Sequence, residues 1–250
     1  MAHFHLADDL GDGDLAVGRV VALGAAESRH AVTVGRIRAG EALLVGDGRG
    51  TIASCTVTTA DAQRLELRVD RVEEHPEPSP RVVLVQALAK GDRDELAVQA
   101  ATELGVDAVI PWQAQRSVSR WEGAKVAKGR DRWQAIVREA VKQSIRPRVP
   151  AVEELATTKD LVRMAATARV LVLDPTAAMR LSRLDLGATG ADAASDVLLV
   201  VGPEGGIGPA EVEALRAAGA IPVALGSGIL RTSTAGPAAL ALVNAALGRW

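Results

Sequence analysis

Apolar runs alternate with segments of helical period over the last two thirds of the chain. The strand-like runs lie at residues 81–89, 107–111, 169–174, 196–201 and 221–226. Between them, the spacing of apolar positions predicts helices over 93–104, about 122–144, about 158–167, 209–219 and 234–247. Continuous apolar strands joined by helices are typical of a parallel sheet covered on both faces, so this part predicts an α/β domain.

The first 74 residues follow a different pattern. Short stretches rich in β-branched residues, at 18–23, 42–45, 52–58 and 64–72, are separated by turns rich in glycine and aspartate. This pattern predicts a small β-barrel over residues 1–74. Three prolines within residues 75–80 then predict a linker, because proline disfavours both helices and central strands, and the α/β domain follows over 81–250. The small and polar segment 186–196 predicts a surface loop.

Composition narrows the class of protein. The 250 residues are 48% hydrophobic, no apolar run approaches the roughly 18 residues of a membrane span, and the start lacks a basic segment followed by an apolar one. We therefore expect a globular protein in the cytoplasm, without a membrane partner. The single cysteine, Cys55, excludes an internal disulfide and predicts a buried, inert thiol. All four histidines lie in the first third, which excludes Ser-His-Asp hydrolysis and a histidine-bound zinc further along, and we expect no metal.

Charge is distributed unevenly along the chain. The net charge of −2 does not by itself indicate a nucleic-acid partner. Residues 115–148, however, carry ten Lys or Arg against three Asp or Glu, a local balance of +7. Such a segment is either a solvated helix face or a track for phosphates. Arg146 and Arg148, on either side of Pro147, favour the second interpretation.

A glycine-rich segment follows the run at 196–201. The sequence GPEGGIGP at 202–209 contains four glycines, more than a plain strand-to-helix turn needs, and Pro209 suits the first position of a helix. Glu204 in its middle would repel a pyrophosphate, and the spacing fits neither dinucleotide nor triphosphate fingerprints. A ligand with a positive centre, such as the sulfonium S-adenosylmethionine, fits better. Glu204 either neutralises the amine of that ligand or caps the helix at 209.

A second glycine-containing segment follows the run at 221–226. Gly226 and Gly228 break the strand, Arg231 offers a cationic fork, and Thr234 is expected to cap the last helix. Open α/β sheets place ligand chemistry at the carboxyl ends of their strands, which is where this arginine lies.

Together these residues resemble a known family. GPEGG at 202–206 with LGSGILRTSTA at 225–235 is similar to the paired signature of the SPOUT methyltransferases, and specifically of the RsmE type, which methylates N3 of a uridine in small-subunit ribosomal RNA. RDELAVQAATELGVDAVIP at 93–111 and REAVKQSIRPRVP at 138–150 resemble the two middle motifs of that type. The resemblance covers nearly the whole chain.

The resemblance implies a fold and a site. It implies an N-terminal barrel of the PUA type, a C-terminal domain with a deep trefoil knot, and a homodimer whose RNA site is completed by the partner subunit. It also implies that S-adenosylmethionine binds in the knot, at Leu173, Gly202, Glu204, Gly205, Leu225, Gly226, Ile229, Leu230, Arg231, Thr234 and Ala235. The family usually reads LRTETA, whereas Ser233 stands at the glutamate position here, which removes a carboxylate from that motif.

The implied chemistry needs a proton removed from uridine N3 and the resulting charge stabilised. Because this domain has no histidine, cysteine or tyrosine, the base is a carboxylate, a water or the bulk solvent. We expect Arg231 to be catalytic by stabilising charge on the uracil carbonyl. For 16S ribosomal RNA in the 30S subunit, the residues expected to contact phosphates are Arg29, Arg36, Arg38, Arg116, Arg146 and Arg148.

Two other classes stay open at this stage. A protein that binds RNA and S-adenosylmethionine without transferring a methyl group would agree with Ser233. A methyltransferase that acts on a different RNA is another alternative. A nucleotide-dependent oxidoreductase is the weaker alternative, since Glu204 and the missing fingerprint argue against it.

Overall fold

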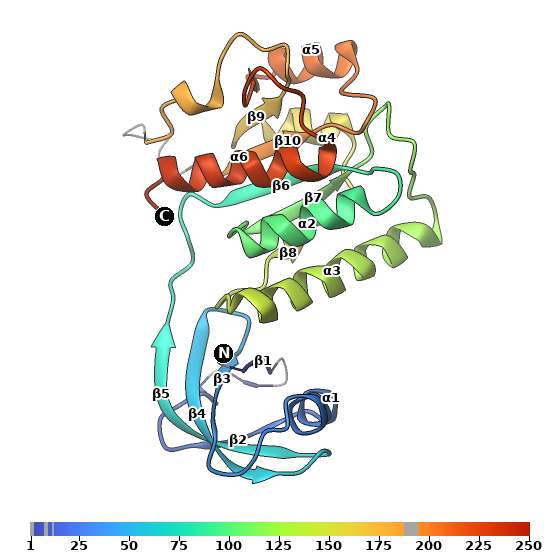
Figure 1. Cartoon of the computed structure of the whole chain (residues 1–250). Coiled ribbons are helices and arrows are strands. Elements are labelled where there is room, and N and C mark those ends of the chain that lie inside the picture. The colour runs from blue at the N-terminus through green and yellow to red at the C-terminus, as the bar shows by residue number, and fades with distance from the viewer. Residues whose placement is uncertain (1–2, 8–9, 12, 188–194) are drawn as a thin grey trace. The chain divides into compact units, whose positions relative to one another are not determined.

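The chain forms two compact units. A computed structural model describes residues 3–7, 10–11, 13–187 and 195–250 (Figure 1). The first unit comprises residues 1–77 together with 141–149, and the second comprises 78–140 and 150–250. Most of the predicted surface loop at 186–196 lies outside the described residues.

The first unit is built on one five-stranded sheet in the order β1-β3-β4-β5-β2. Its strands are β1 (Phe4–Leu6), β2 (Val20–Leu23), β3 (Ala42–Gly46), β4 (Thr51–Ala60) and β5 (Leu65–Glu74), and the short helix α1 (Ala25–Arg29) runs into a π-helical turn, η1 (His30–Val34). All four strands expected from the sequence are present, and β1, which pairs with β3 in parallel, was not expected. Alternate residues of β3, β4 and β5 point into a core that includes Cys55.

Residues 141–149 belong to the first unit because a loop of that unit binds them. The main-chain N–H of Gly50 donates to the carbonyl of Pro147 at 3.0 Å, and that of Val149 donates to the carbonyl of Gly48 at 2.9 Å. Gly50 has a φ of 123°, and a Cβ there would lie 2.5 Å from a guanidinium nitrogen of Arg148, so only glycine fits. The sequence-based division at 75–80 did not include this return of the chain.

The second unit contains a six-stranded, all-parallel sheet in the order β11-β9-β10-β6-β7-β8. Its strands are β6 (Val82–Ala87), β7 (Ala108–Trp112), β8 (Ala151–Val152), β9 (Arg169–Leu173), β10 (Val197–Val201) and β11 (Ile221–Val223). Its helices are α2 (Arg93–Glu103), α3 (Ala124–Ser144, whose last turn belongs to the first unit), α4 (Thr158–Met164), the 3₁₀ turn η2 (Leu181–Arg183), α5 (Pro209–Ala217) and α6 (Thr232–Ala246). The prediction of an α/β domain is confirmed.

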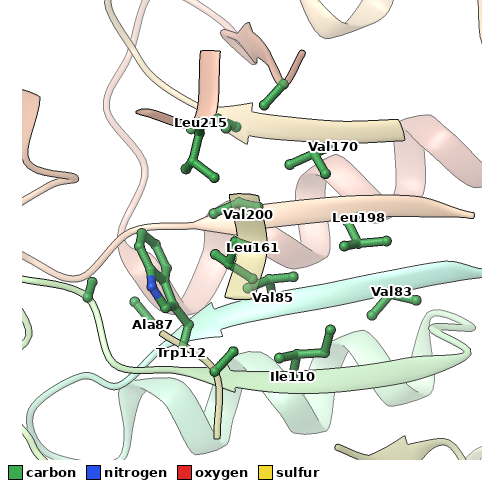
Figure 2. Packing of buried hydrophobic residues seen from close by; sticks show 14 of the residues in the cluster. Val83, Val85, Ala87, Ile110, Trp112, Leu161, Val170, Leu198, Val200 and Leu215 are labelled. Carbon is green, nitrogen blue, oxygen red and sulfur yellow. The ribbon is translucent and has the colours of Figure 1, made fainter. Parts of the chain in front are cut away.

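Helices cover both faces of this sheet, as the continuous apolar strands predict. On one face, Val83 and Val85 of β6 pack in a cluster with Leu161 of α4 and Leu215 of α5 (Figure 2). Because side chains alternate along a strand, the intervening residues of β6 point to the opposite face, which α2 and α6 cover (Figure 1). A Cβ at Gly236 of α6 would lie 2.8 Å from Cδ1 of Leu84, so glycine lets this helix approach β6 closely.

The two predicted helix starts have different outcomes. Helix α5 begins at Pro209 after the cap residue Gly208, as expected. Helix α6 begins at Thr232, with Arg231 as the cap residue, so Thr234 lies within the first turn and the prediction that it caps the helix is wrong. The backbone of Arg231 is extended, and the helix begins at Thr232, two residues before the predicted start at 234.

Candidate functional site

The second unit has a pocket at the carboxyl ends of β9, β10 and β11. Its volume is about 400 Å³, within the range of small-molecule sites. It is formed by the segments that follow these three strands, together with the start of α2 and of α6. The lining residues are Arg93, Leu173, Asp174, Pro175, Val201, Gly202, Pro203, Glu204, Gly206, Val223, Leu225, Gly228, Ile229, Leu230, Arg231, Thr232 and Ala235.

Most of the residues expected to bind a cofactor line this pocket. Those that do are Leu173, Gly202, Glu204, Leu225, Ile229, Leu230, Arg231 and Ala235. The remaining three, Gly205, Gly226 and Thr234, belong to the same segments but do not line it. Sequence reasoning missed Asp174, although its position directly after an apolar strand was a usable signal. It also missed Arg93, which reaches the pocket only because α2 follows the neighbouring strand β6.

The loop from Gly202 to Gly208 is shaped by glycine at separate points. Gly206 has a φ of 70° and its N–H donates to the carbonyl of Pro203 at 2.9 Å, closing a turn. A Cβ at Gly202 would lie 2.6 Å from Cγ1 of Ile207, and one at Gly208 would lie 2.6 Å from Oε1 of Gln115. The backbone therefore turns sharply in a space that larger residues would fill.

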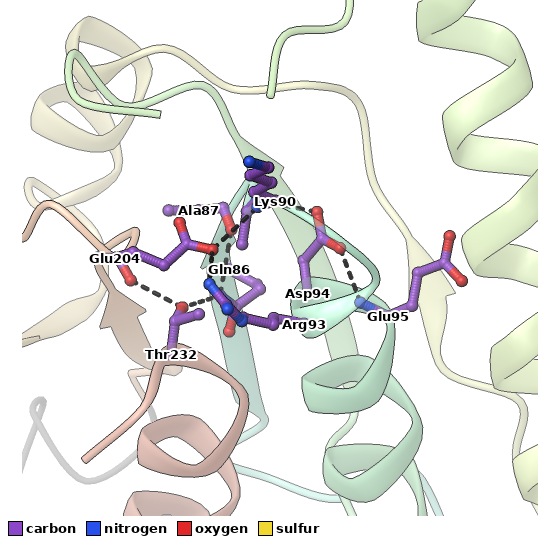
Figure 3. A network of polar contacts seen from close by, with 10 residues as sticks. Gln86, Ala87, Lys90, Arg93, Asp94, Glu95, Glu204 and Thr232 are labelled. Carbon is purple, nitrogen blue, oxygen red and sulfur yellow. Dashed lines mark hydrogen bonds and ion pairs between the residues drawn. The ribbon is translucent and has the colours of Figure 1, made fainter. Parts of the chain in front are cut away.

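Glu204 is held by the segment that follows β6. Its Oε1 accepts hydrogen bonds from the main-chain N–H of Lys90 at 3.0 Å and from Nη1 of Arg93 at 2.8 Å (Figure 3). Burial works to raise the pKa of Glu204, but hydrogen bonds from its own N–H, Arg93 and Lys90 outweigh burial and hold that pKa below its usual value. Glu204 is therefore an anion paired with Arg93.

Glu211, and not Glu204, caps helix α5. Oε2 of Glu211 accepts from the N–H of Gly208 at 3.1 Å, so of the two roles considered for Glu204 that of helix cap is wrong. Oε1 of Glu211 accepts from the N–H of Gln115 at 2.9 Å and from the hydroxyl of Thr158 at 2.7 Å. This buried carboxylate thus fixes the end of the glycine-rich loop to two other segments.

A chain of hydrogen bonds joins the two glycine-containing segments beneath the pocket. Nε2 of Gln86, on β6, donates to the hydroxyl of Thr232 at 2.9 Å, and this hydroxyl donates to the carbonyl of Gly202 at 2.8 Å (Figure 3). Gln86 is fully buried and Thr232 is 6% exposed. The start of α6 and the start of the glycine-rich loop are held together in this way.

The remaining charged groups of the pocket are Arg231 and Asp174. The Arg231 side chain is exposed and makes no hydrogen bond or ion pair with the part of the chain that the structure describes. Oδ1 of Asp174 accepts from the N–H and the hydroxyl of Thr176, at 2.8 and 2.7 Å. Since Arg93 and Glu204 neutralise each other, the pocket offers a ligand one free cation and one carboxylate.

The residues expected to bind RNA divide between the units. Arg29, Arg36 and Arg38 belong to the first unit, are exposed, and make no side-chain hydrogen bond or ion pair with the described residues. Arg146 and Arg148 also belong to the first unit and are half-buried, and Nη2 of Arg148 donates to the carbonyl of His75 at 2.8 Å. Arg116 belongs to the second unit and binds the glycine-rich loop, with Nη1 donating to the carbonyl of Gly205 at 3.0 Å.

Part of the basic segment 115–148 has a structural role. Arg132 makes a bidentate contact with Glu95 at 2.7–3.1 Å, Arg130 donates to Glu154, and Lys142 lies 3.2 Å from Glu27. These cations are compensated within the chain. The segment is therefore not one continuous free track for phosphates.

Three further expectations concern the cysteine, metal binding and membrane-spanning helices. Cys55 is buried, as predicted, and burial raises the pKa of its thiol to about 12. Within the described ranges, no group of three or more His, Cys, Asp or Glu side chains is placed to hold a metal ion. In the same ranges, no helix is long and apolar enough to cross a membrane.

Comparison with known proteins identifies the class. Residues 75–244 match the family model of an RNA methyltransferase domain, and residues 23–70 match that of an RNA methyltransferase PUA domain. The chain thus combines an RNA methyltransferase domain with a PUA domain.

Its relatives identify the family within that class. The chain is 47% identical to ribosomal RNA small subunit methyltransferase E of Mycobacterium tuberculosis, over 93% of this chain and 89% of the relative, and 33% identical to that of Bacillus subtilis, over 87% of each. A crystal structure of this enzyme from Neisseria gonorrhoeae, bound to S-adenosyl methionine, is 29% identical and superposes with a TM-score of 0.85 over 98% of both chains. The chain belongs to the family of ribosomal RNA small subunit methyltransferases E.

Proposed function

We propose that this protein transfers the methyl group of S-adenosylmethionine to N3 of a specific uridine in 16S ribosomal RNA, within the 30S subunit. The observation that carries the proposal is the pocket, because both of its glycine-containing segments lie in the region that matches the RNA methyltransferase family. The relatives named ribosomal RNA small subunit methyltransferase E support small-subunit ribosomal RNA as the substrate.

The residues of the pocket fit S-adenosylmethionine. Leu173, Leu225 and Ile229 line the pocket and would provide apolar walls for an adenine ring. The cofactor carries an ammonium, a carboxylate and a sulfonium, and the pocket offers Asp174 and Arg231 as groups of opposite charge. When bound, the cofactor supplies an electrophilic methyl group.

Arg231 is the proposed catalytic residue. Attack by N3 of uridine would form the N–C bond while the C–S bond of the cofactor breaks. N3 must first lose its proton, and the negative charge that this leaves on the uracil ring must be stabilised. The guanidinium of Arg231 is exposed at the pocket and lacks a partner in the described chain, so it is available to hold charge on a uracil carbonyl.

The proton of N3 needs an acceptor, and the pocket has two carboxylates. Glu204 is the poorer base, because its partners hold its pKa below the usual value and Arg93 already occupies one of its oxygens. Asp174 has no cationic partner among the described residues. We therefore place the proton on a water that Asp174 holds, which leaves this carboxylate charged opposite the positive groups of the cofactor.

The proposed RNA contacts are Arg29, Arg36, Arg38, Arg116, Arg146 and Arg148. Four of these side chains are exposed, and the first three carry charge that the described residues do not compensate. Arg116 lies beside the glycine-rich loop, where it would meet the RNA close to the reacting base. Such contacts position the substrate without reading its sequence.

We further propose a homodimer that acts in the cytoplasm. Leu96 on α2 is 52% exposed and Leu242 on α6 is 39% exposed, and these two helices pack against each other in the second unit. Exposed apolar side chains on neighbouring helices are a feature of interfaces between subunits. The trefoil knot also stays a prediction from the family resemblance.

The test is methyl transfer from labelled S-adenosylmethionine to 30S subunits from cells that lack this gene, followed by mass spectrometry of the modified base. We expect one N3-methyluridine. A different methylated base would reject the assigned atom, and transfer only to another RNA would reject the substrate. Cofactor binding without transfer to any RNA would indicate a non-catalytic binding protein, and would agree with Ser233 at the position of the family's glutamate.

A further inference from the structure

Gln86 is a polar residue in a strand that is otherwise apolar. Every residue of β6 is buried, and the other five are Val82, Val83, Leu84, Val85 and Ala87. Gln86 lies in the middle of the sheet, paired with Val201 of β10 and Pro111 of β7. Its Oε1 has no hydrogen-bond partner within the described chain, and an unpaired buried oxygen destabilises a fold. The apolar packing of β6 therefore gives no reason for glutamine here.

The orientation of the amide is fixed by its surroundings. Nε2 lies 3.1 Å from the carbonyl of Ala87 and 2.9 Å from the hydroxyl of Thr232. A carbonyl only accepts, so the nitrogen and not the oxygen must face it. The hydroxyl of Thr232 then accepts from Gln86 and must point its own hydrogen at the carbonyl of Gly202, 2.8 Å away.

This relay connects two walls of the pocket that are distant in sequence. Gly202 begins the loop after β10, and Thr232 begins α6; both line the pocket, whereas Gln86 does not. The same segment of the chain holds the loop at a second point, because Lys90 and Arg93 bind Glu204. Asp94 braces this segment by accepting from the N–H of Ala89 at 3.0 Å.

We propose that Gln86 is a positioning residue for the cofactor: through the hydroxyl of Thr232 it fixes the spacing between the loop at Gly202 and the start of α6 that S-adenosylmethionine requires. The proposal rests on the proposed function only in that this cofactor is the ligand. Gln86 is fully buried and does not line the pocket. Its effect is therefore on affinity for S-adenosylmethionine, with turnover at saturating cofactor retained.

The test compares three variants of the full chain. Gln86→Met keeps the length of the side chain but cannot donate, Thr232→Val removes the hydroxyl, and Thr232→Ser keeps it. Calorimetric titration with S-adenosylmethionine measures Kd, and thermal unfolding measures Tm. We expect Q86M and T232V each to weaken binding about tenfold, the effect of losing one buried hydrogen bond, and T232S to bind within about twofold of wild type.

Stability separates positioning from a merely structural role. Q86M removes an unpaired buried oxygen together with the two hydrogen bonds of Nε2, and these changes oppose each other in stability, so its Tm should stay close to that of wild type while its affinity falls. KM for S-adenosylmethionine should rise with little change in kcat. The double variant Q86M/T232V should bind no more weakly than T232V alone, since both changes break one relay. Should Q86M fail to fold, T232V against T232S gives the same comparison.

Two results would overturn the proposal. If Q86M or T232V binds S-adenosylmethionine as tightly as wild type, the relay has no role in cofactor binding. If the losses of affinity add in the double variant, the two residues act separately. A wild-type chain that does not bind S-adenosylmethionine would overturn the proposed function as well, which distinguishes that failure from the failure of the relay.

Discussion

The guanidinium of Arg116 donates a hydrogen bond from Nη1 to the carbonyl oxygen of Gly205, at 3.0 Å. This contact joins the basic segment 115–148 to the glycine-rich loop of the pocket. The stem of Arg116 also lies along the loop, since a Cβ at Gly205 would be 3.5 Å from Cβ of Arg116. A residue expected to bind RNA thus supports the loop that borders the cofactor pocket.

Replacing Arg116 should therefore weaken cofactor binding as well as RNA binding. We expect R116A to raise Kd for S-adenosylmethionine about two- to fivefold, because one exposed hydrogen bond to the loop is lost. Lys128, exposed on α3, is the matched control, and K128A should leave that Kd unchanged. Calorimetry without RNA makes the comparison, and equal Kd values for the two variants would contradict it.

Arg231 should be required for turnover and not for folding. We expect R231A to lower kcat about 10²- to 10³-fold, since a donor to developing charge is removed. Its Tm should match wild type, because the side chain is exposed and has no partner in the described chain. R231K keeps the charge but not the planar fork and should recover only part of the rate. Single-turnover methylation of 30S subunits measures this, and R231A turnover close to wild type would reject the role.

Arg36 and Arg38 should contribute phosphate contacts. The double variant R36A/R38A should weaken RNA binding and reduce the slope of log K against log salt by about 2, one for each contact. R64A/R71A removes the same charge from the same unit, at arginines already paired with Glu66 and Glu73. This control should keep the slope of wild type. Filter binding at several salt concentrations tests it, and identical slopes for both double variants would remove these residues from the interface.

Glu27 should make the stability of the protein depend on pH. The hydrogen bond from His5 lowers its pKa, burial opposes this, and the charge of Lys142 adds to the lowering, so the pKa is about 2 instead of 4.5. A lowered pKa stabilises the folded state above about pH 4.5, and this contribution is lost as the pH falls towards 2. We expect E27Q to be destabilised by on the order of 2–3 kcal/mol at pH 6.

The difference between wild type and E27Q should shrink as the pH is lowered. Urea unfolding of both proteins from pH 6 to pH 3 measures it. A difference that stays constant over this range would show that Glu27 contributes through packing and not through its charge.

Cys55 should be inert in the folded protein. Its thiol is buried and its pKa is raised to about 12, so the thiolate is scarce at neutral pH. A maleimide at pH 7.5 should label the protein only after unfolding in guanidinium chloride. Rapid labelling under native conditions would show that β4 opens readily.

Local patterns in the sequence determined the elements and the loops of the site. Apolar periodicity places β6, α2, β10 and α5 within a few residues of their observed bounds, because side chains that repeat with the period of a strand or helix must share one face. The four glycines before Pro209 predicted a ligand loop, because the backbone conformation of a glycine-rich segment depends on residues that are neighbours in the chain.

Only the tertiary structure decided the partners. Glu204 is bound by Arg93, 111 residues away, and Gln86 meets Thr232 across 146 residues. Neither contact has a periodic signature, since each depends on which strands lie side by side in the sheet. The arginines of the basic segment also have different partners. Arg132 pairs with Glu95 and Arg116 binds the glycine-rich loop, although nothing in the sequence distinguishes the two. Spacing along the chain determines which residues lie on one face of a helix or strand, and long-range packing determines which residues contact that face.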